Sequence, residues 1–101
     1  MSYVTVNYSI KQAYTVVEST FYQFLDQLVA DLPVVELVGK PEILYSKNND
    51  NAGFVIDLKI KRGQNLANTL NEFTNEFYKR FYSLLEMKPL ALKICFCGYF
   101  D

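Results

Sequence analysis

The sequence predicts an α+β fold: a two-layer sandwich in which two helices lie on one face of a mixed sheet of three or four strands. Several short segments alternate between apolar and polar residues, which is the period of a strand. Two longer segments repeat apolar residues every three or four positions, which is the period of a helix. The expected order is β-α-β-β-α-β, and one shared core can bury every apolar stripe and strand face.

Size and charge limit the classes of protein that the chain can belong to. Its 101 residues, half of them hydrophobic, predict a single domain over residues 1–101. Ten basic residues balance eleven acidic ones, so no chain-wide positive field favours nucleic acid. The first residues lack a signal peptide, and no apolar run is long enough for direct membrane insertion. With only two cysteines, we expect a cytoplasmic protein that meets a membrane, if at all, through a partner.

The first third of the chain predicts one strand followed by one long helix. Residues 3–8 alternate as a half-buried strand does. Ser9 and Gln12 have the spacing of a capping box, which predicts that a helix begins at Ile10. Pro33 ends that helix. Its expected inward stripe consists of Ile10, Tyr14, Val17, Phe21, Phe24, Leu25 and Leu28.

The middle of the chain predicts a hairpin. Residues 34–41 are interpreted as a partly extended connector, and residues 42–45 as a strand. Residues 46–53 are rich in Asn, Asp and Gly, which predicts a turn. The strand that follows, residues 54–61, alternates most clearly. Its predicted core residues are Phe54, Ile56, Leu58 and Ile60, and its predicted outward residues are Val55, Asp57, Lys59 and Lys61.

The last third predicts a second helix and a final strand. Asn65 is a suitable N-cap, and Pro89 follows the expected end of the helix. Residues 90–97 alternate again. The predicted inward residues are Leu66, Leu70, Phe73, Phe77, Phe81 and Leu84 on the helix, and Leu90, Leu92, Ile94 and Phe96 on the strand.

The two cysteines, Cys95 and Cys97, lie on the outward face of that last strand. In an extended strand they are about 6.5–7 Å apart, at the upper limit for a disulfide. The chain has no histidine to complete a zinc site or to activate a thiol. We therefore interpret both as small structural residues and expect no metal and no cofactor. A metal site shared between two chains, or a redox role, is the remaining alternative.

Basic residues gather on the same outward face. Lys59, Lys61 and Lys93, with Arg62 at the strand end, could meet RNA phosphates. Sheet modules that bind RNA stack bases on aromatic side chains, whereas the outward positions here hold aliphatic, acidic or sulfur side chains. Solvated lysines are therefore the favoured interpretation, and RNA binding is the alternative. The candidate partner-binding residues are Lys59, Lys61, Arg62, Lys93, Cys95 and Cys97.

Two further sets of residues allow a structural and a functional interpretation. Tyr22, Tyr78 and Tyr82 border the helical stripes, where tyrosines usually widen the core contact. Together with the apolar connector they could instead form a docking patch. The carboxylates Glu72 and Glu76 are one helical turn apart, but without histidine or a phosphate loop they do not resemble an acid–base pair. The sequence therefore predicts a protein that is not an enzyme.

The second half of the chain resembles the alkaline shock protein family of low-GC Gram-positive bacteria and mollicutes. In that family an alternating strand with an aspartate leads into a glycine, then an asparagine that opens a helix, and a Met-containing turn precedes a final alternating strand. The matching residues here are Asp57, Leu58, Ile60, Gly63, Asn65, Leu66, Met87 and Leu90 to Phe96.

This resemblance implies a non-enzymatic interaction or scaffold protein linked to cell-envelope homeostasis or stress. Its partner would be a protein, with a membrane-anchored one among the options, and a homo-oligomer is a further option. The resemblance brings no catalytic residue. A small nucleic-acid-binding module with a basic sheet face is the alternative function.

Overall fold

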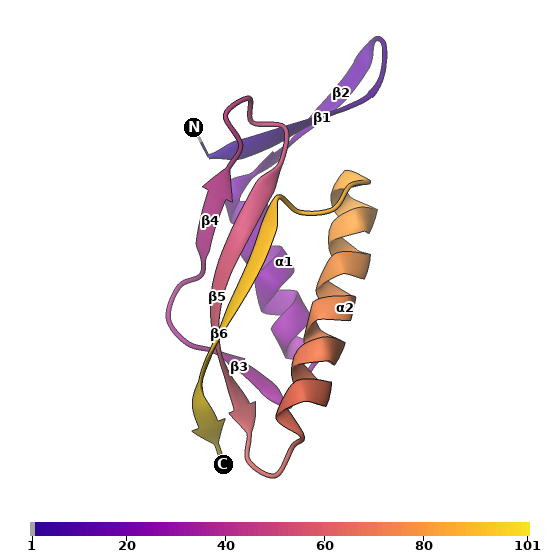
Figure 1. The fold of residues 1–101 in the computed structure, drawn as a ribbon. Helices are drawn as coiled ribbons and strands as arrows, with labels where there is room; N and C mark the ends of the chain where they lie inside the picture. The colour runs from indigo at the N-terminus through magenta and orange to yellow at the C-terminus, as the bar shows by residue number, and fades with distance from the viewer. Residues whose placement is uncertain (1) are drawn as a thin grey trace.

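The computed structural model describes residues 2–101 and confirms an α+β fold with two helices (Figure 1). The order of its elements is β-β-α-β-β-β-α-β, so two strands are present that the expected order lacked. The elements are β1 (Tyr3–Ser9), β2 (Gln12–Val17), α1 (Glu18–Ala30), β3 (Val35–Leu37), β4 (Glu42–Tyr45), β5 (Ala52–Lys61), α2 (Leu66–Leu85) and β6 (Ala91–Phe100).

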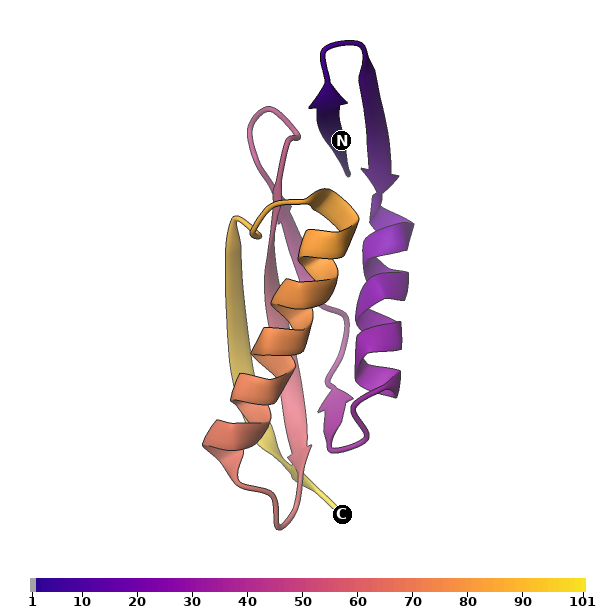
Figure 2. The ribbon, with the colours of Figure 1, turned by 90° about the vertical axis from the view of Figure 1, so that its right-hand side faces the viewer.

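The larger sheet is built around β5. Strands β3 and β4 pair antiparallel with successive parts of one edge of β5, and β6 pairs parallel with the other edge along its length. The sheet is therefore mixed, as expected. Both helices cover the same face, with α2 in front of β5 and β6 and α1 beside it (Figure 2). Strands β1 and β2 form a separate antiparallel hairpin.

The core between the sheet and the helices is centred on Phe54 in β5. Its ring lies 5.7 Å from the ring of Phe21 in α1 and 5.1 Å from that of Phe77 in α2, both in edge-to-face geometry. Phe77 in turn stacks on Phe81 at 5.8 Å. These contacts join the sheet, α1 and α2 in one core. The fully buried large residues are Val4, Phe21, Leu25, Leu28, Phe54, Ile56, Leu58, Ile60, Phe73, Phe77, Phe81 and Leu85.

The prediction that the first helix begins at Ile10 is wrong. Residues 12–17 form β2, and α1 begins only at Glu18. Thr15, Val16 and Val17 are β-branched, which favours a strand. Around Tyr14 and Val16, apolar residues recur at the spacing of a helix and also at that of a strand. Periodicity alone therefore did not distinguish a helix from a strand here. Within α1 the expected stripe is correct, because Phe21, Leu25 and Leu28 are buried.

The residues that suggested a helix cap instead close a hairpin. Ser9 and Gln12 face each other at the end of the β1–β2 ladder, and the Ser9 hydroxyl donates to Gln12 Oε1 at 3.4 Å. Ile10 sits in the two-residue turn between them and is fully exposed. The base of the hairpin is fixed to the body, since the Tyr14 hydroxyl donates to the Leu84 carbonyl oxygen at 2.6 Å.

Other boundaries differ by a few residues. The connector contains the short strand β3, β5 begins at Ala52, and β6 continues to Phe100. The strand at residues 42–45 is confirmed. Asn65 caps α2 as expected, because its side chain accepts a hydrogen bond from the Asn68 amide at 2.9 Å.

The expectation that all of Leu90, Leu92, Ile94 and Phe96 face the core is partly wrong. Leu92 and Ile94 are half-buried and pack against the core, but Leu90 is 56% exposed and Phe96 38% exposed. The physical reason is that β6 lies at the edge of the sheet, so these side chains have neighbours on one side only. Alternation predicts the face of a strand correctly but not its distance from the edge.

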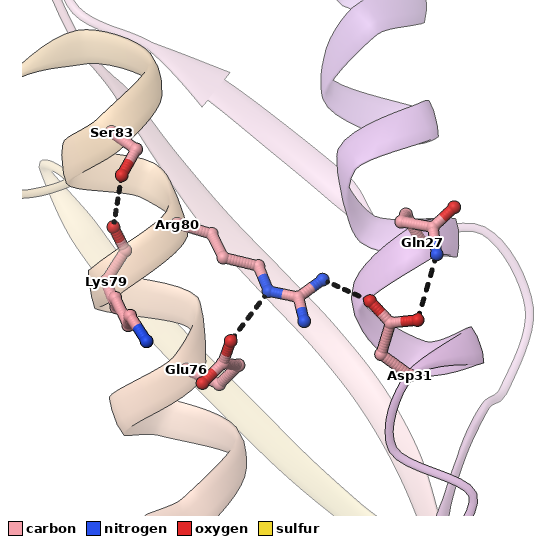
Figure 3. Close-up of polar contacts among 6 residues, drawn as sticks. All are labelled: Gln27, Asp31, Glu76, Lys79, Arg80 and Ser83. Atoms are coloured by element: carbon pink, nitrogen blue, oxygen red, sulfur yellow. Dashed lines mark hydrogen bonds and ion pairs between the residues drawn. The ribbon is translucent and has the colours of Figure 1, made fainter.

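An ion-pair network joins the two helices (Figure 3). Arg80 of α2 contacts Asp31, the C-cap of α1, at 2.8 Å, and Glu76 one turn before it, also at 2.8 Å. Hydrogen bonds from Arg80 and Gln27 lower the pKa of the Asp31 carboxyl, and those to Glu76 and Asp31 raise the pKa of the Arg80 guanidinium. The network fixes which flank of α2 faces α1.

Candidate functional site

The candidate site is the face of the larger sheet that lies opposite the helices, called here the open face. Within residues 2–101, no helix covers it. Strand pairing arranges its side chains in rows across the sheet. One row runs Glu42, Val55, Lys93 from β4 through β5 to β6. The neighbouring rows contain Asp57 beside Cys95, and Glu36 beside Lys59. Leu44, 47% exposed, extends the face past Glu42.

These rows alternate in charge. Lys59 lies beside Glu36, and Lys93 is separated from Glu42 only by the half-buried Val55. Of these, only Glu36 and Lys59 are on neighbouring strands, where opposite charges attract and at this exposure contribute at most about 1 kcal/mol. The open face therefore carries charges of both signs around a narrow apolar strip. It is not a continuous basic stripe.

The predicted site residues are brought together only in part. Lys59, Lys93 and Cys95 share the central rows of the open face. Lys61 has the same alternation but lies at the far end of β5, beside Phe100. The structure therefore groups three of the six candidates in the central rows, and Lys61 lies farther along the same face.

Arg62 does not belong to that surface. Its Nε donates to Asp101 Oδ1 at 2.8 Å, and its guanidinium lies 5.8 Å from the centre of the Tyr99 ring. Both contacts hold it at the C-terminal end of β6. Arg62 therefore lies at the strand end, as expected, and its role as a partner-binding residue stays a prediction.

The two cysteines differ in their surroundings. Both thiols are free; Cys95 is half-buried and Cys97 is exposed. The β5–β6 register shifts between Leu58 and Ile60, so Cys97 and Gly98 together lie opposite Lys59 in a bulge. Gly98 has φ of 117°, a conformation that side-chain-bearing residues rarely adopt. Cys97 therefore departs from the simple strand geometry that the alternation predicted.

Sequence reasoning missed the acidic half of the open face. Glu36 was assigned to a connector, and Glu42 was not considered with the lysines. Alternation in residues 42–45 placed Glu42 and Leu44 on one side of a strand, but nothing in the sequence gave the register that sets Glu42 beside Val55. The signal for Glu36 was weaker still, because β3 has only three residues.

A concave feature lies where the β1–β2 hairpin meets the rest of the molecule. A shallow cleft of about 340 Å³ separates β1 from the β4–β5 turn, lined by Thr5, Val6, Asn7, Asp50, Asn51 and Met87. Its polar groups are engaged in fold-forming bonds: the Thr5 amide donates to the Asn49 carbonyl oxygen, and Asn51 donates to the Lys88 carbonyl oxygen. The cleft is the seam by which the hairpin attaches to the body.

Two absences complete the description of residues 2–101. In this part of the chain no group of three or more His, Cys, Asp or Glu side chains is arranged to hold a metal ion. Nor does any helix there have the length and apolar character needed to cross a membrane.

Comparisons of this chain with models of protein families, with curated proteins and with solved structures found no match. The fold and the open face are therefore the observations from which a function must be argued.

Proposed function

We propose that this protein is a non-enzymatic interaction domain that binds a protein partner through the open face of its larger sheet. The observation that carries the proposal is the alternation of Glu36, Lys59, Glu42 and Lys93 around Val55. A surface with both signs of charge and a small apolar centre has the composition of a transient protein interface. A phosphate backbone would be repelled by the acidic half.

The family resemblance gives this proposal its biological setting. Two of the residues that carry it have defined local roles in this chain: Gly63 has φ of 93° in the turn after β5, and Asn65 caps α2. From the resemblance alone we propose a cytoplasmic scaffold of the alkaline shock type, acting in envelope homeostasis or stress, whose contact with the membrane runs through its partner.

The test uses charge reversal on the open face. The double variant Lys59→Glu, Lys93→Glu should lose the partner that the wild-type chain captures from lysate of the cells that encode it. The matched control is Lys79→Glu, on the exposed surface of α2, which should retain that partner. Quantitative mass spectrometry of the captured proteins provides the measurement. Equal recovery by both variants would remove the open face as the binding surface.

Nucleic-acid binding, the alternative function, is tested on the same proteins. Fluorescence anisotropy with single-stranded RNA at two salt concentrations should detect no salt-sensitive binding by the wild-type chain. An affinity that falls steeply with salt and disappears in Lys59→Glu, Lys61→Glu would contradict the proposal and favour the RNA module.

A further inference from the structure

The second notable surface of the molecule is the outer edge of β6. This strand pairs with β5 on its inner side, and among residues 2–101 no strand pairs with its outer side. Alternate residues of this ten-residue strand therefore point their N–H and C=O groups away from β5 along this edge. Between Ala91 and Phe100 the sequence has no proline and one charged residue, Lys93. An edge of this kind is a template for pairing with another strand.

Exposed apolar side chains gather beside this edge. Leu90, Phe96 and Tyr99 belong to the β6 segment, and Phe96 and Tyr99 touch each other with ring centres 5.1 Å apart. On α2, Tyr78 and Tyr82 are 40% and 59% exposed. We call these five residues the edge patch.

The helix geometry places the two tyrosines on the β6 side. Successive residues of a helix are rotated by about 100°. Relative to the buried Phe77, Tyr78 therefore projects to one side and Arg80 to the other. Arg80 contacts Asp31 on α1 (Figure 3). Tyr78, and Tyr82 one turn later, thus lie on the flank away from α1, which is the flank above β6 (Figure 2).

We propose that a second copy of this chain pairs antiparallel with β6 about a two-fold axis at Ile94, so that the two larger sheets become one continuous sheet. An interface of this symmetry must be complementary to itself. With the axis at Ile94, Leu92 of each copy meets Phe96 of the other on the helix side. The two edge patches then face each other, and both helix layers lie on the same face of the joined sheet.

The charges fit a second copy as well. In this register the one charged residue, Lys93, does not meet its own copy but lies opposite the other copy's Cys95. Cys95 is the neighbour of Asp57 in β5. Lys93 would therefore lie in one row with the acidic Glu42 of its own chain and Asp57 of the other, each about 10 Å away between Cα atoms. Long side chains on the same face can span that separation.

The first experiment measures mass in solution. Sedimentation equilibrium of the full chain should show twice the monomer mass of 11.7 kDa at high concentration. Phe96→Lys, which places a charge opposite Leu92 of the other copy, should raise the dimer dissociation constant about tenfold or more. Leu44→Lys introduces the same charge at an exposed leucine on β4 and should leave the constant unchanged. A wild-type chain that stays monomeric at every concentration overturns the proposal.

The second experiment tests the register. In a chain with Cys95→Ser and Cys97→Ser, the variant Ile94→Cys should form a disulfide-linked dimer on mild oxidation, because only the residue on the axis meets its own copy. Leu90→Cys in the same background should not. A dimer that is insensitive to Phe96→Lys, or that cross-links through Leu90→Cys and not Ile94→Cys, would show a different interface. Since Lys59→Glu, Lys93→Glu tests the open face separately, either proposal can fail alone.

Discussion

The two edges of the larger sheet are protected to very different degrees. One edge of β5 is covered by β3 and β4, which have three and four residues and carry Glu36 and Glu42 outward. Glycine and proline interrupt the chain between them. Short strands, charges and proline are the means by which proteins prevent edge-to-edge association. β6, on the other edge, is ten residues long with one lysine, and its one bulge, at Cys97 and Gly98, lies beyond the contact of Leu92 with Phe96 that the proposed pairing uses.

The same sheet is therefore closed at one edge and open to pairing at the other. The side chains of β3 and β4 complete the core: Val35 is buried, and Tyr45 lies 6.3 Å from the ring of Phe21. The exposed side chains of β6 contribute little to the core of a single chain. The stability of the monomer and the capacity to associate should therefore reside in different residues.

Matched aromatic substitutions give the largest expected contrast. Phe77→Ala removes a fully buried ring from the contact with Phe54 and should lower the free energy of unfolding by about 3–5 kcal/mol. Phe96→Ser, at the edge, should lower it by only about 1–2 kcal/mol when the chain is monomeric, because that ring is 38% exposed. Urea unfolding followed by circular dichroism measures both. Equal losses would mean that the edge patch belongs to the monomer core.

Helix α2 connects the parallel strands β5 and β6, and the cap at its N-terminus stabilises this connection. Asn65→Ala removes the hydrogen bond to the Asn68 amide and should cost about 1 kcal/mol. Asn68→Ala, three residues later on the exposed face, is the control and should cost less than about 0.5 kcal/mol, because its side chain does not cap the helix. Thermal unfolding of the two variants compares them. A more stable Asn65→Ala protein would contradict the role of this cap.

The helix contact should produce a smaller, pH-dependent effect. Arg80 and Gln27 hold the pKa of Asp31 below its usual value of 3.8 in the folded state. The contribution of Asp31 to stability is therefore complete above about pH 4 and is lost as the pH falls through the lowered folded-state pKa. Asp31→Asn should be less stable than wild type at pH 6 and should approach it at pH 2. A difference that is the same at both pH values would exclude this ionisation as the cause.

The sequence allowed the central part of this fold to be predicted and left its edges undetermined. The strand around Phe54 and the α2 stripe through Phe77 were predictable because their periodicities are long and regular. The β1–β2 hairpin was not, because Ser9 and Gln12 suit a helix cap and a hairpin end equally. Register is a tertiary property. The register between strands could not be predicted from local sequence patterns. Yet this register is what places Glu36 and Glu42 near the lysines of the open face.

Concentration-dependent hydrogen exchange compares the two edges most directly. As the protein concentration rises, the outward-pointing amides of residues 91–97 should exchange more slowly, since pairing with a second copy protects the outer edge of this part of β6. Those of residues 35–45 should exchange at a constant rate. Exchange in β6 that does not depend on concentration, or equal slowing at both edges, would contradict the assignment of β6 as the associating edge.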